Sequence, residues 1–319
     1  MDLMAAPLAL YNFIIGTLVP FLFVLTIIVF FHELGHFLVA RWNKVKVDAF
    51  SIGFGPEIFG FNDKRGTRWK LSAIPLGGYV KFFGDEDPTS KPDTAKLEAM
   101  NADEREGAFE HKAVWRRALV VAAGPIANFL LAIVIYTALF MTYDDVKVLP
   151  VVGAVVEGSA AEAAGFQVGD KIVELDGKPV TSFQDISDAT SINSGSAMTF
   201  VVERNGKPVP LTASPRITEQ TDRFGNTFKV AMVGLRSAVG EENVEFTALG
   251  PVDAFKKAVY QTWFATVRTV HFIGELIMGR QDASELRGPI GIGHVTSQVA
   301  TLGIAQLMSL AAIISISIG

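Results

Sequence analysis

Two histidines and a glutamate stand close together in the segment His32-Glu33-Leu34-Gly35-His36. On a helix, His32 and His36 lie one turn apart on the same face, so both imidazoles can reach a single metal ion. Glu33 lies beside them, where its carboxylate can take a proton from a water that the metal activates. This residue set is typical of zinc hydrolases, but it also arises by chance on exposed helices. The interpretation therefore depends on the segment that carries it.

Long uncharged segments surround this pattern. Asp, Glu, Lys and Arg are absent from residues 3–31, 118–143 and 288–319. A membrane-spanning helix needs about 20 apolar residues, so the first two segments predict membrane spans. The third segment is less apolar at its start and reaches Gly319 without a closing charge. Ionisable groups next to a span are costly and usually functional, which favours a metal site over a polar helix end.

The composition supports a membrane protein. Of the 319 residues, 50% are hydrophobic and 19% are charged, which is too apolar for an ordinary soluble enzyme of this size. The 28 basic and 33 acidic residues leave a net charge of −5. No basic stripe with interleaved aromatic residues follows the chain, so nucleic acid is not an expected partner. The sequence has no cysteine, which excludes thiolate metal sites.

Basic residues predict the orientation in the membrane. They flank the segment between the first two spans, as Arg41, Lys44 and Lys46 at its start and Lys112, Arg116 and Arg117 at its end. The positive-inside rule then places this segment in the cytoplasm, and the N-terminus and everything after the second span outside. A cleaved signal peptide is the alternative for the N-terminus, but the residues before the apolar stretch carry Asp2 and no basic residue.

Glycine-punctuated strand patterns, turn signals and helical periodicity divide the chain into segments. We expect a first transmembrane helix with the zinc motif at 1–42, a membrane-associated β region at 43–84, a cytoplasmic loop at 85–113, a second transmembrane helix at 114–143, a small α+β domain at 150–236, an amphipathic interfacial helix at 251–279 and the start of a third transmembrane helix at 300–319. The predicted fold class is an α-helical polytopic membrane protein with a small membrane-associated β-sheet and one inserted α+β domain.

A catalytic zinc site normally has three protein ligands. The remaining histidines, His111, His271 and His294, lie in segments with other expected roles. His294 is next to a candidate span, but a histidine at a membrane edge is its simpler interpretation. The third ligand is not visible in these residues.

Five motifs in order resemble the bacterial site-2 proteases, and more narrowly the type that regulates sigma-E. These are His32–His36, Gly53-Phe54-Gly55-Pro56, Pro75-Leu76-Gly77-Gly78-Tyr79-Val80-Lys81, the second-span segment from Val121 to Phe129, and Gly288-Pro289-Ile290-Gly291-Ile292. The resemblance implies an intramembrane zinc metalloprotease of the bacterial inner membrane. It implies Zn²⁺ as cofactor, His32 and His36 as its ligands and Glu33 as general base. Its substrates would be single-pass membrane proteins such as an anti-sigma factor, or remnant signal peptides.

The resemblance also implies substrate-binding elements. These would be Gly53, Phe54, Gly55 and Pro56 together with Gly77, Gly78, Tyr79 and Val80. Cleavage of a helix requires local unwinding, and a strand edge can hold the unwound segment by β-augmentation. The alternative is that these glycines only permit tight turns. Asn128 would contact the substrate backbone, or it would make a hydrogen bond between neighbouring helices.

The family's third zinc ligand is an aspartate of an Asn-x-x-Pro-x-Pro-x-Leu-Asp-Gly motif, which this sequence does not contain. We expect that motif just beyond Gly319, so we expect this chain to be truncated and weak or inactive by itself. The α+β domain resembles a single PDZ domain of rearranged topology. Its expected ligand loop, for a peptide or a protein C-terminus, is Gly165, Phe166, Gln167, Val168 and Gly169.

Two other functions remain open at this point. The chain would be a membrane-anchored PDZ adaptor if its zinc motif were vestigial. A structural zinc site that only joins helices is a third possibility, but Glu33 argues against it, because a closed site has no need of a base.

Overall fold

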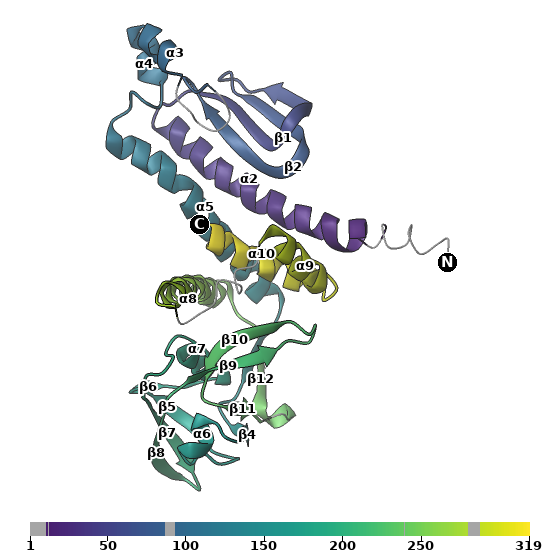
Figure 1. Cartoon of the computed structure of the whole chain (residues 1–319), viewed down its shortest axis with the longest axis vertical. Coiled ribbons are helices and arrows are strands. Elements are labelled where there is room, and N and C mark those ends of the chain that lie inside the picture. The colour runs from purple at the N-terminus through teal and green to yellow at the C-terminus, as the bar shows by residue number, and fades with distance from the viewer. Residues whose placement is uncertain (1–10, 12, 87–92, 239, 280–287) are drawn as a thin grey trace. The chain divides into compact units, whose positions relative to one another are not determined.

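The computed structural model describes residues 11, 13–86, 93–238, 240–279 and 288–319 (Figure 1). The chain divides into two compact units. The first unit comprises Met1–Leu139, Phe255–Thr266 and Arg287–Gly319, and the second comprises Phe140–Ala254 and Val267–Leu286. The first unit carries the long apolar helices and the zinc motif. The second unit carries a small domain of strands and short helices.

Two helices of the first unit are long and apolar enough to cross a membrane, Ile14–Trp42 and Val114–Thr142. The first consists of a π-helical start, η1 (Ile14–Leu18), continued by α2 (Val19–Trp42). The second is α5 (Val114–Thr142), which contains Pro125. By length and composition these are the two spans expected from the sequence. Residues 1–10 of the expected first helix lie outside the described residues.

The helices α2 and α5 pack closely and run antiparallel. At Gly35 of α2, a Cβ atom would lie 2.3 Å from the carbonyl oxygen of Ala123 and 2.7 Å from the Cβ of Ala127. A glycine is therefore required here, as is common where membrane helices approach each other. Because His36 contacts Val120 and His32 contacts Asn128, the end of α2 lies against the beginning of α5.

Two shorter helices, α9 (Pro289–Ala300) and α10 (Ile304–Ile318), pack against these spans in the same unit. The chain turns between them at Gly303, whose φ of +111° suits glycine. Leu307 and Ala311 of α10 share a buried cluster with Val24 and Ile28 of α2. The apolar segment 288–319 therefore forms two helices in place of one continuous span.

A long hairpin lies beside α2 and consists of β1 (Val47–Asn62) and β2 (Arg68–Phe82). Both strands bend, so that β1 residues 49–52 pair with β2 residues 68–71 on one side and with 78–81 on the other. Residues 78–82 are thus an edge, with β1 on one side. The sheet is anchored on α2 by a core that includes Phe37, Phe50 and Phe82. Part of the expected loop 85–113 is helical, as α3 (Thr94–Ala99) and α4 (Ala102–Gly107).

The second unit is built from antiparallel strand pairs. Its largest sheet has the order β6-β5-β7-β8, and three pairs join β4 to β11, β9 to β10 and β3 to β12. The strands are β3 (Asp145–Val148), β4 (Val152–Val155), β5 (Lys171–Leu175), β6 (Lys178–Pro179), β7 (Met198–Arg204), β8 (Lys207–Ala213), β9 (Arg216–Thr221), β10 (Thr227–Met232), β11 (Leu235–Ser237) and β12 (Val244–Thr247). The helices are α6 (Ala160–Ala163), α7 (Phe183–Ser191) and the 3₁₀ turn η2 (Glu241–Asn243).

A buried ion pair supports the core of the second unit. Asp170 is 1% exposed and accepts hydrogen bonds from Nε and Nη2 of Arg204, each at 2.7 Å. Two parallel bonds of this kind are the strong form of an arginine–carboxylate pair. In the hydrophobic core of the same unit, Phe166 and Phe200 pack edge to face, with ring centroids 5.3 Å apart.

The helix α8 (Pro251–Ile277) forms in the segment where the interfacial helix was expected. Its residues are shared between the two units. Several of its large apolar side chains are exposed, namely Val252, Phe255, Trp263 and Ile277. Its position in a membrane interface stays a prediction.

Candidate metal and catalytic site

The last turns of α2 bring the two histidines together. Their Nε2 atoms lie 3.2 Å apart, and their rings stand nearly perpendicular with centroids 4.9 Å apart. Two ring nitrogens at this distance are positioned to share one ion, since zinc–nitrogen bonds are about 2.0–2.1 Å long. The spacing of the sequence motif is thus realised as a convergent pair.

Each histidine is oriented by a group on α5. The Nδ1 atom of His36 lies 2.7 Å from the carbonyl oxygen of Val120, to which it donates when Nε2 is the ligand. The Nδ1 atom of His32 lies 3.2 Å from the side-chain amide of Asn128. With the Asn128 oxygen turned toward it, this ring also donates from Nδ1 and keeps Nε2 free. Both imidazoles therefore present the same nitrogen to the shared position.

Asn128 is fully buried, and its side-chain oxygen has no hydrogen-bond partner among the described residues. Its backbone carbonyl accepts a hydrogen bond from the Ser315 hydroxyl at 3.0 Å. A buried amide oxygen without a donor is costly, and rotation of the amide toward His32 removes that cost. The sequence predicted either a substrate contact or an interhelical hydrogen bond for Asn128. The structure brings it to His32, and its contact with substrate stays a prediction.

Gly124 of α5 leaves the space in front of the imidazoles open. A Cβ atom at this position would lie 2.3 Å from Nε2 of His36 and 2.7 Å from Nε2 of His32. No side chain larger than hydrogen fits there while the nitrogens converge. No role was predicted for Gly124 from the sequence, although a glycine four residues before Asn128 on a span was a usable signal.

Among the described residues, the two Nε2 atoms of His32 and His36 are suited to bind zinc. Convergent neutral imidazoles with oriented Nδ1 atoms are what zinc requires of histidine ligands. Among the described residues no group of three His, Cys, Asp or Glu side chains comes together to hold a metal. His294 is exposed and lies 3.0 Å from Gln298. The aspartate expected from the resemblance as third ligand remains a prediction.

Glu33 is held against the edge of the hairpin. Its carboxylate accepts a hydrogen bond from the backbone N–H of Val80. A Cβ atom on the neighbouring Gly78 would lie 3.3 Å from Cγ of Glu33 and 2.7 Å from the carbonyl oxygen of Ser51. Glycine at this position therefore lets the strand approach the glutamate.

The two glycine motifs of the hairpin meet each other. Phe54 and Tyr79 stack with ring centroids 6.1 Å apart, and a Cβ atom on Gly77 would lie 2.5 Å from the Phe54 ring. Gly53 and Gly55 both have positive φ, at +85° and +81°, and Pro56 follows in the exposed part of β1. The structure thus unites both sets of predicted substrate-binding residues at one place. Their contact with a substrate is a proposal.

The predicted ligand loop of the second unit is less open than expected. Phe166 is 5% exposed and belongs to the core. The backbone N–H groups of Gly165, Phe166, Gln167 and Gly169 already donate within the domain, to Glu162, Ala161, Asp170 and Val152. Val168 is 70% exposed. This geometry does not favour a carboxylate cradle at the loop, because its donors are engaged.

Comparison with known proteins identifies the family. The model of peptidase family M50 matches residues 20–319. A protein of Agrobacterium fabrum, described as a candidate zinc metalloprotease, is 46% identical over 98% of this chain and 83% of its own length. Metalloprotease MmpA of Caulobacter vibrioides is 40% identical over 91% of this chain and 74% of its own length.

Among solved structures, the PDZ domain of an SdrC-like protein from Listeria monocytogenes matches 30% of this chain and 88% of that chain, with 22% identity and a TM-score of 0.22. The matched family model covers the zinc motif, most of the first long apolar helix, all of the second and the hairpin beside them. The chain belongs to peptidase family M50.

Proposed function

We propose that this chain is a zinc endopeptidase that cleaves the membrane-spanning segments of single-pass membrane proteins. The observation that carries the proposal is the pair of Nε2 atoms, 3.2 Å apart, next to Glu33 on a helix apolar enough to cross a membrane. Membership of family M50 and relatives named as metalloproteases support the assignment of zinc.

The residues divide the chemistry between them. His32 and His36 would hold zinc through Nε2, because their Nδ1 atoms face partners on α5. Zinc bound there would polarise the scissile carbonyl and lower the pKa of the attacking water to about 7. The Glu33 carboxylate takes the proton from that water and delivers it to the leaving amine nitrogen.

The hairpin edge supports a substrate that is unwound before cleavage. A helix engages its amides in internal hydrogen bonds, so the scissile segment must become extended. Residues 78–82 pair with β1 on one side, and the N–H of Val80 points away from β1 toward Glu33. An extended substrate paired along this edge lies within reach of the glutamate. Anti-sigma factors and remnant signal peptides are the substrate classes that we propose.

The proposed location is a bacterial inner membrane, with residues 43–113 in the cytoplasm and with the N-terminus and the second unit in the periplasm. The basic residues at the end of α2 and at the start of α5 support this orientation. For the second unit we propose a PDZ domain that binds a peptide, although the engaged N–H groups of residues 165–169 do not favour a C-terminal carboxylate at that loop. Its antiparallel strand pairs with short helices support that fold.

Glu33→Gln tests the mechanism in the full-length, membrane-embedded protein. We expect stoichiometric zinc in both wild type and E33Q, and a loss of about 10²–10⁴-fold in cleavage of a tagged single-pass reporter by E33Q. H32A and H36A should lose zinc. E157Q and H294A, which change residues outside the site, serve as controls for cleavage and for zinc.

Cleavage retained by E33Q would overturn the assignment of the base. Wild-type protein without bound zinc would overturn the enzyme and favour the membrane-anchored adaptor. Zinc retained by H32A or H36A would remove these residues from the ligand set.

A further inference from the structure

A basic pocket lies just past the end of α2 in the first unit. Its volume is about 470 Å³. It is formed by the residues that follow α2, by the turn between β1 and β2 and by the end of α4. Its charged lining residues are the cations Arg41, Lys44, Lys46 and Arg65 and the carboxylates Asp48 and Glu106. Neither the zinc site nor the proposed substrate edge uses this pocket.

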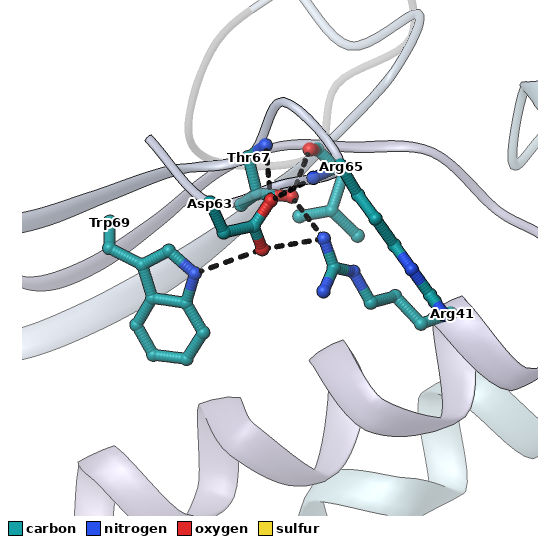
Figure 2. A network of polar contacts seen from close by, with 6 residues as sticks. Arg41, Asp63, Arg65, Thr67 and Trp69 are labelled. Carbon is teal, nitrogen blue, oxygen red and sulfur yellow. Dashed lines mark hydrogen bonds and ion pairs between the residues drawn. The ribbon is translucent and has the colours of Figure 1, made fainter. Parts of the chain in front are cut away.

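One wall of the pocket is a fixed polar network (Figure 2). Arg41 donates from Nη2 to Oδ2 of Asp63 at 2.6 Å and to the Thr67 hydroxyl at 3.0 Å. Asp63 also accepts from the backbone N–H groups of Arg65 and Thr67 and from the indole of Trp69. Burial alone would raise the pKa of Asp63, but these donors and the Arg41 charge hold it below its usual value. Asp63 is therefore the counter-ion of Arg41.

The other three cations lack such a counter-ion. Lys44, Lys46 and Arg65 are exposed, and none of them forms an ion pair within the described part of the chain. Lys46 places its ammonium 5.3 Å from the centre of the Phe83 ring. Lys44 has a positive φ of +58° where the chain turns away from α2. Three exposed cations thus line one open pocket.

A buried lysine, Lys112, lies close to the pocket. It donates from Nζ to the backbone carbonyl of Glu106. Burial lowers its pKa, and the charges of Arg116 and Lys44 lower it further, against an opposing contribution from Glu106.

Two tryptophans indicate the depth of the pocket in a membrane. Trp42 ends α2 and is 80% exposed, and Trp115 begins α5 and is 59% exposed. Because α2 and α5 run antiparallel, both tryptophans belong to the same end of the helix pair. Exposed tryptophans at span ends mark the membrane–water interface. Residues 41–48 therefore lie at the level of the lipid headgroups.

We infer that this pocket binds a phosphate group, and that the phosphate is the headgroup of an anionic phospholipid. Arginine matches phosphate oxygens in a forked geometry, and lysines add point charges that need no fixed direction. Basic pockets at the cytoplasmic end of membrane helices are suited to anionic headgroups. A phosphatidylcholine headgroup fits less well, because its own ammonium offsets the phosphate charge.

Thermal unfolding of the full chain in detergent micelles tests the proposal. The probes are dioctanoyl phosphatidylglycerol, dioctanoyl phosphatidylcholine and sodium phosphate, each at the same concentration. A ligand that binds the folded state raises Tm by mass action. We expect phosphatidylglycerol to raise Tm by roughly 2–4 °C in wild type, phosphatidylcholine to have no effect, and the shift to disappear in K44Q/K46Q/R65Q. The matched control K64Q/K70Q/K178Q removes the same charge outside the pocket and should keep the shift.

A Tm shift of equal size with both lipids, or a shift that persists in K44Q/K46Q/R65Q, would overturn the proposal that this pocket binds an anionic headgroup. An equal shift with sodium phosphate that K44Q/K46Q/R65Q abolishes would retain the phosphate site but overturn the lipid as its source. Circular dichroism and the Tm without added lipid check that the triple variant folds. If it does not fold, the single variants K44Q and R65Q replace it, and each should reduce the shift.

Discussion

The amide of Asn128 lies 3.2 Å from Nδ1 of His32, although 96 positions separate the two residues in the chain. The other histidine, His36, meets a backbone carbonyl of the same helix at 2.7 Å. Both zinc-ligand candidates on α2 are thus oriented by α5. The affinity for zinc should therefore depend on how α2 and α5 pack, because a misplaced α5 leaves both imidazole rings free to rotate.

The contact between Asn128 and His32 predicts a loss of zinc affinity for one substitution of Asn128 and little change for another. N128L removes the acceptor for the Nδ1–H of His32, so zinc affinity should fall about 10–100-fold. N128D restores an acceptor oxygen and should hold zinc within a few-fold of wild type. Competition with a chromogenic chelator measures both affinities. T137A removes a polar group elsewhere on α5, whose hydroxyl bonds to Ile133, and should change nothing.

Equal losses in N128L and N128D would contradict the acceptor role of Asn128, because aspartate supplies an acceptor oxygen in a side chain of the same shape. Full affinity in N128L would show that His32 is oriented by another group. In the second case Asn128 remains available for the substrate contact predicted from the sequence.

Gly124→Ala should remove zinc binding by obstruction. The added methyl group would lie 2.3 Å from Nε2 of His36, so either the ring or the helix must move. Such overpacking costs about 1–3 kcal/mol in folding stability. We expect lower zinc content and a lower Tm. G274A is the matched control, because a Cβ atom at Gly274 meets nothing within 4 Å and alanine favours a helix. Unchanged zinc content in G124A would contradict the geometry of the site.

Arg204→Met should destabilise the second unit and change its response to acid. Burial works to raise the pKa of Asp170, but hydrogen bonds from Arg204 and Gln167 outweigh it and hold the pKa below its usual value. A carboxyl with a lowered pKa stabilises the fold at neutral pH, and this contribution is lost as pH falls through its titration range. Without Arg204 a buried charge loses its partner.

We therefore expect R204M to unfold at least about 5 °C below wild type at pH 7, with a smaller difference near pH 3. R68M removes an arginine from the exposed pair with Glu57 and should have little effect, because surface pairs contribute little. A constant difference between R204M and wild type across this pH range would exclude the ion pair as its cause.

Asp85 predicts a pH dependence of the opposite sign. It is 4% exposed, and burial raises its pKa to about 6, with further contributions from Glu110 and Asp48 against the N–H of Phe82. A carboxyl with a raised pKa contributes its stability fully below its ordinary pKa, and this contribution is lost as pH rises through about 6. D85N avoids the cost of the buried charge and can still accept from Phe82.

The stability advantage of D85N over wild type should thus grow between pH 4 and pH 7, to on the order of 2 kcal/mol. Denaturant unfolding at several pH values measures it, with D144N as a control at an exposed carboxylate. An advantage that is independent of pH would mean that Asp85 does not titrate in this range.

Some features of the site were accessible from the sequence because they are local. The spacing of His32 and His36 places them on one face of any helix, and the flanking apolar residues determine that this segment is a long helix. The charge-free segment 118–143 predicts α5 for the same reason. The break at Gly303 was not predicted, because an apolar run does not show where a helix ends when no charge or proline marks the position.

The sequence by itself determined which residues are the candidate metal ligands and the candidate base, since a helix of 3.6 residues per turn brings His32, Glu33 and His36 together without any other element. Tertiary structure alone decided what surrounds them. Val120 supplies a backbone carbonyl to His36, and Val80 supplies a backbone N–H to Glu33. Gly124 leaves the space in front of the imidazoles open because it has no side chain. Backbone groups and empty space are present at every position of a chain, so only the packing of α5 and β2 against α2 selects which of them act.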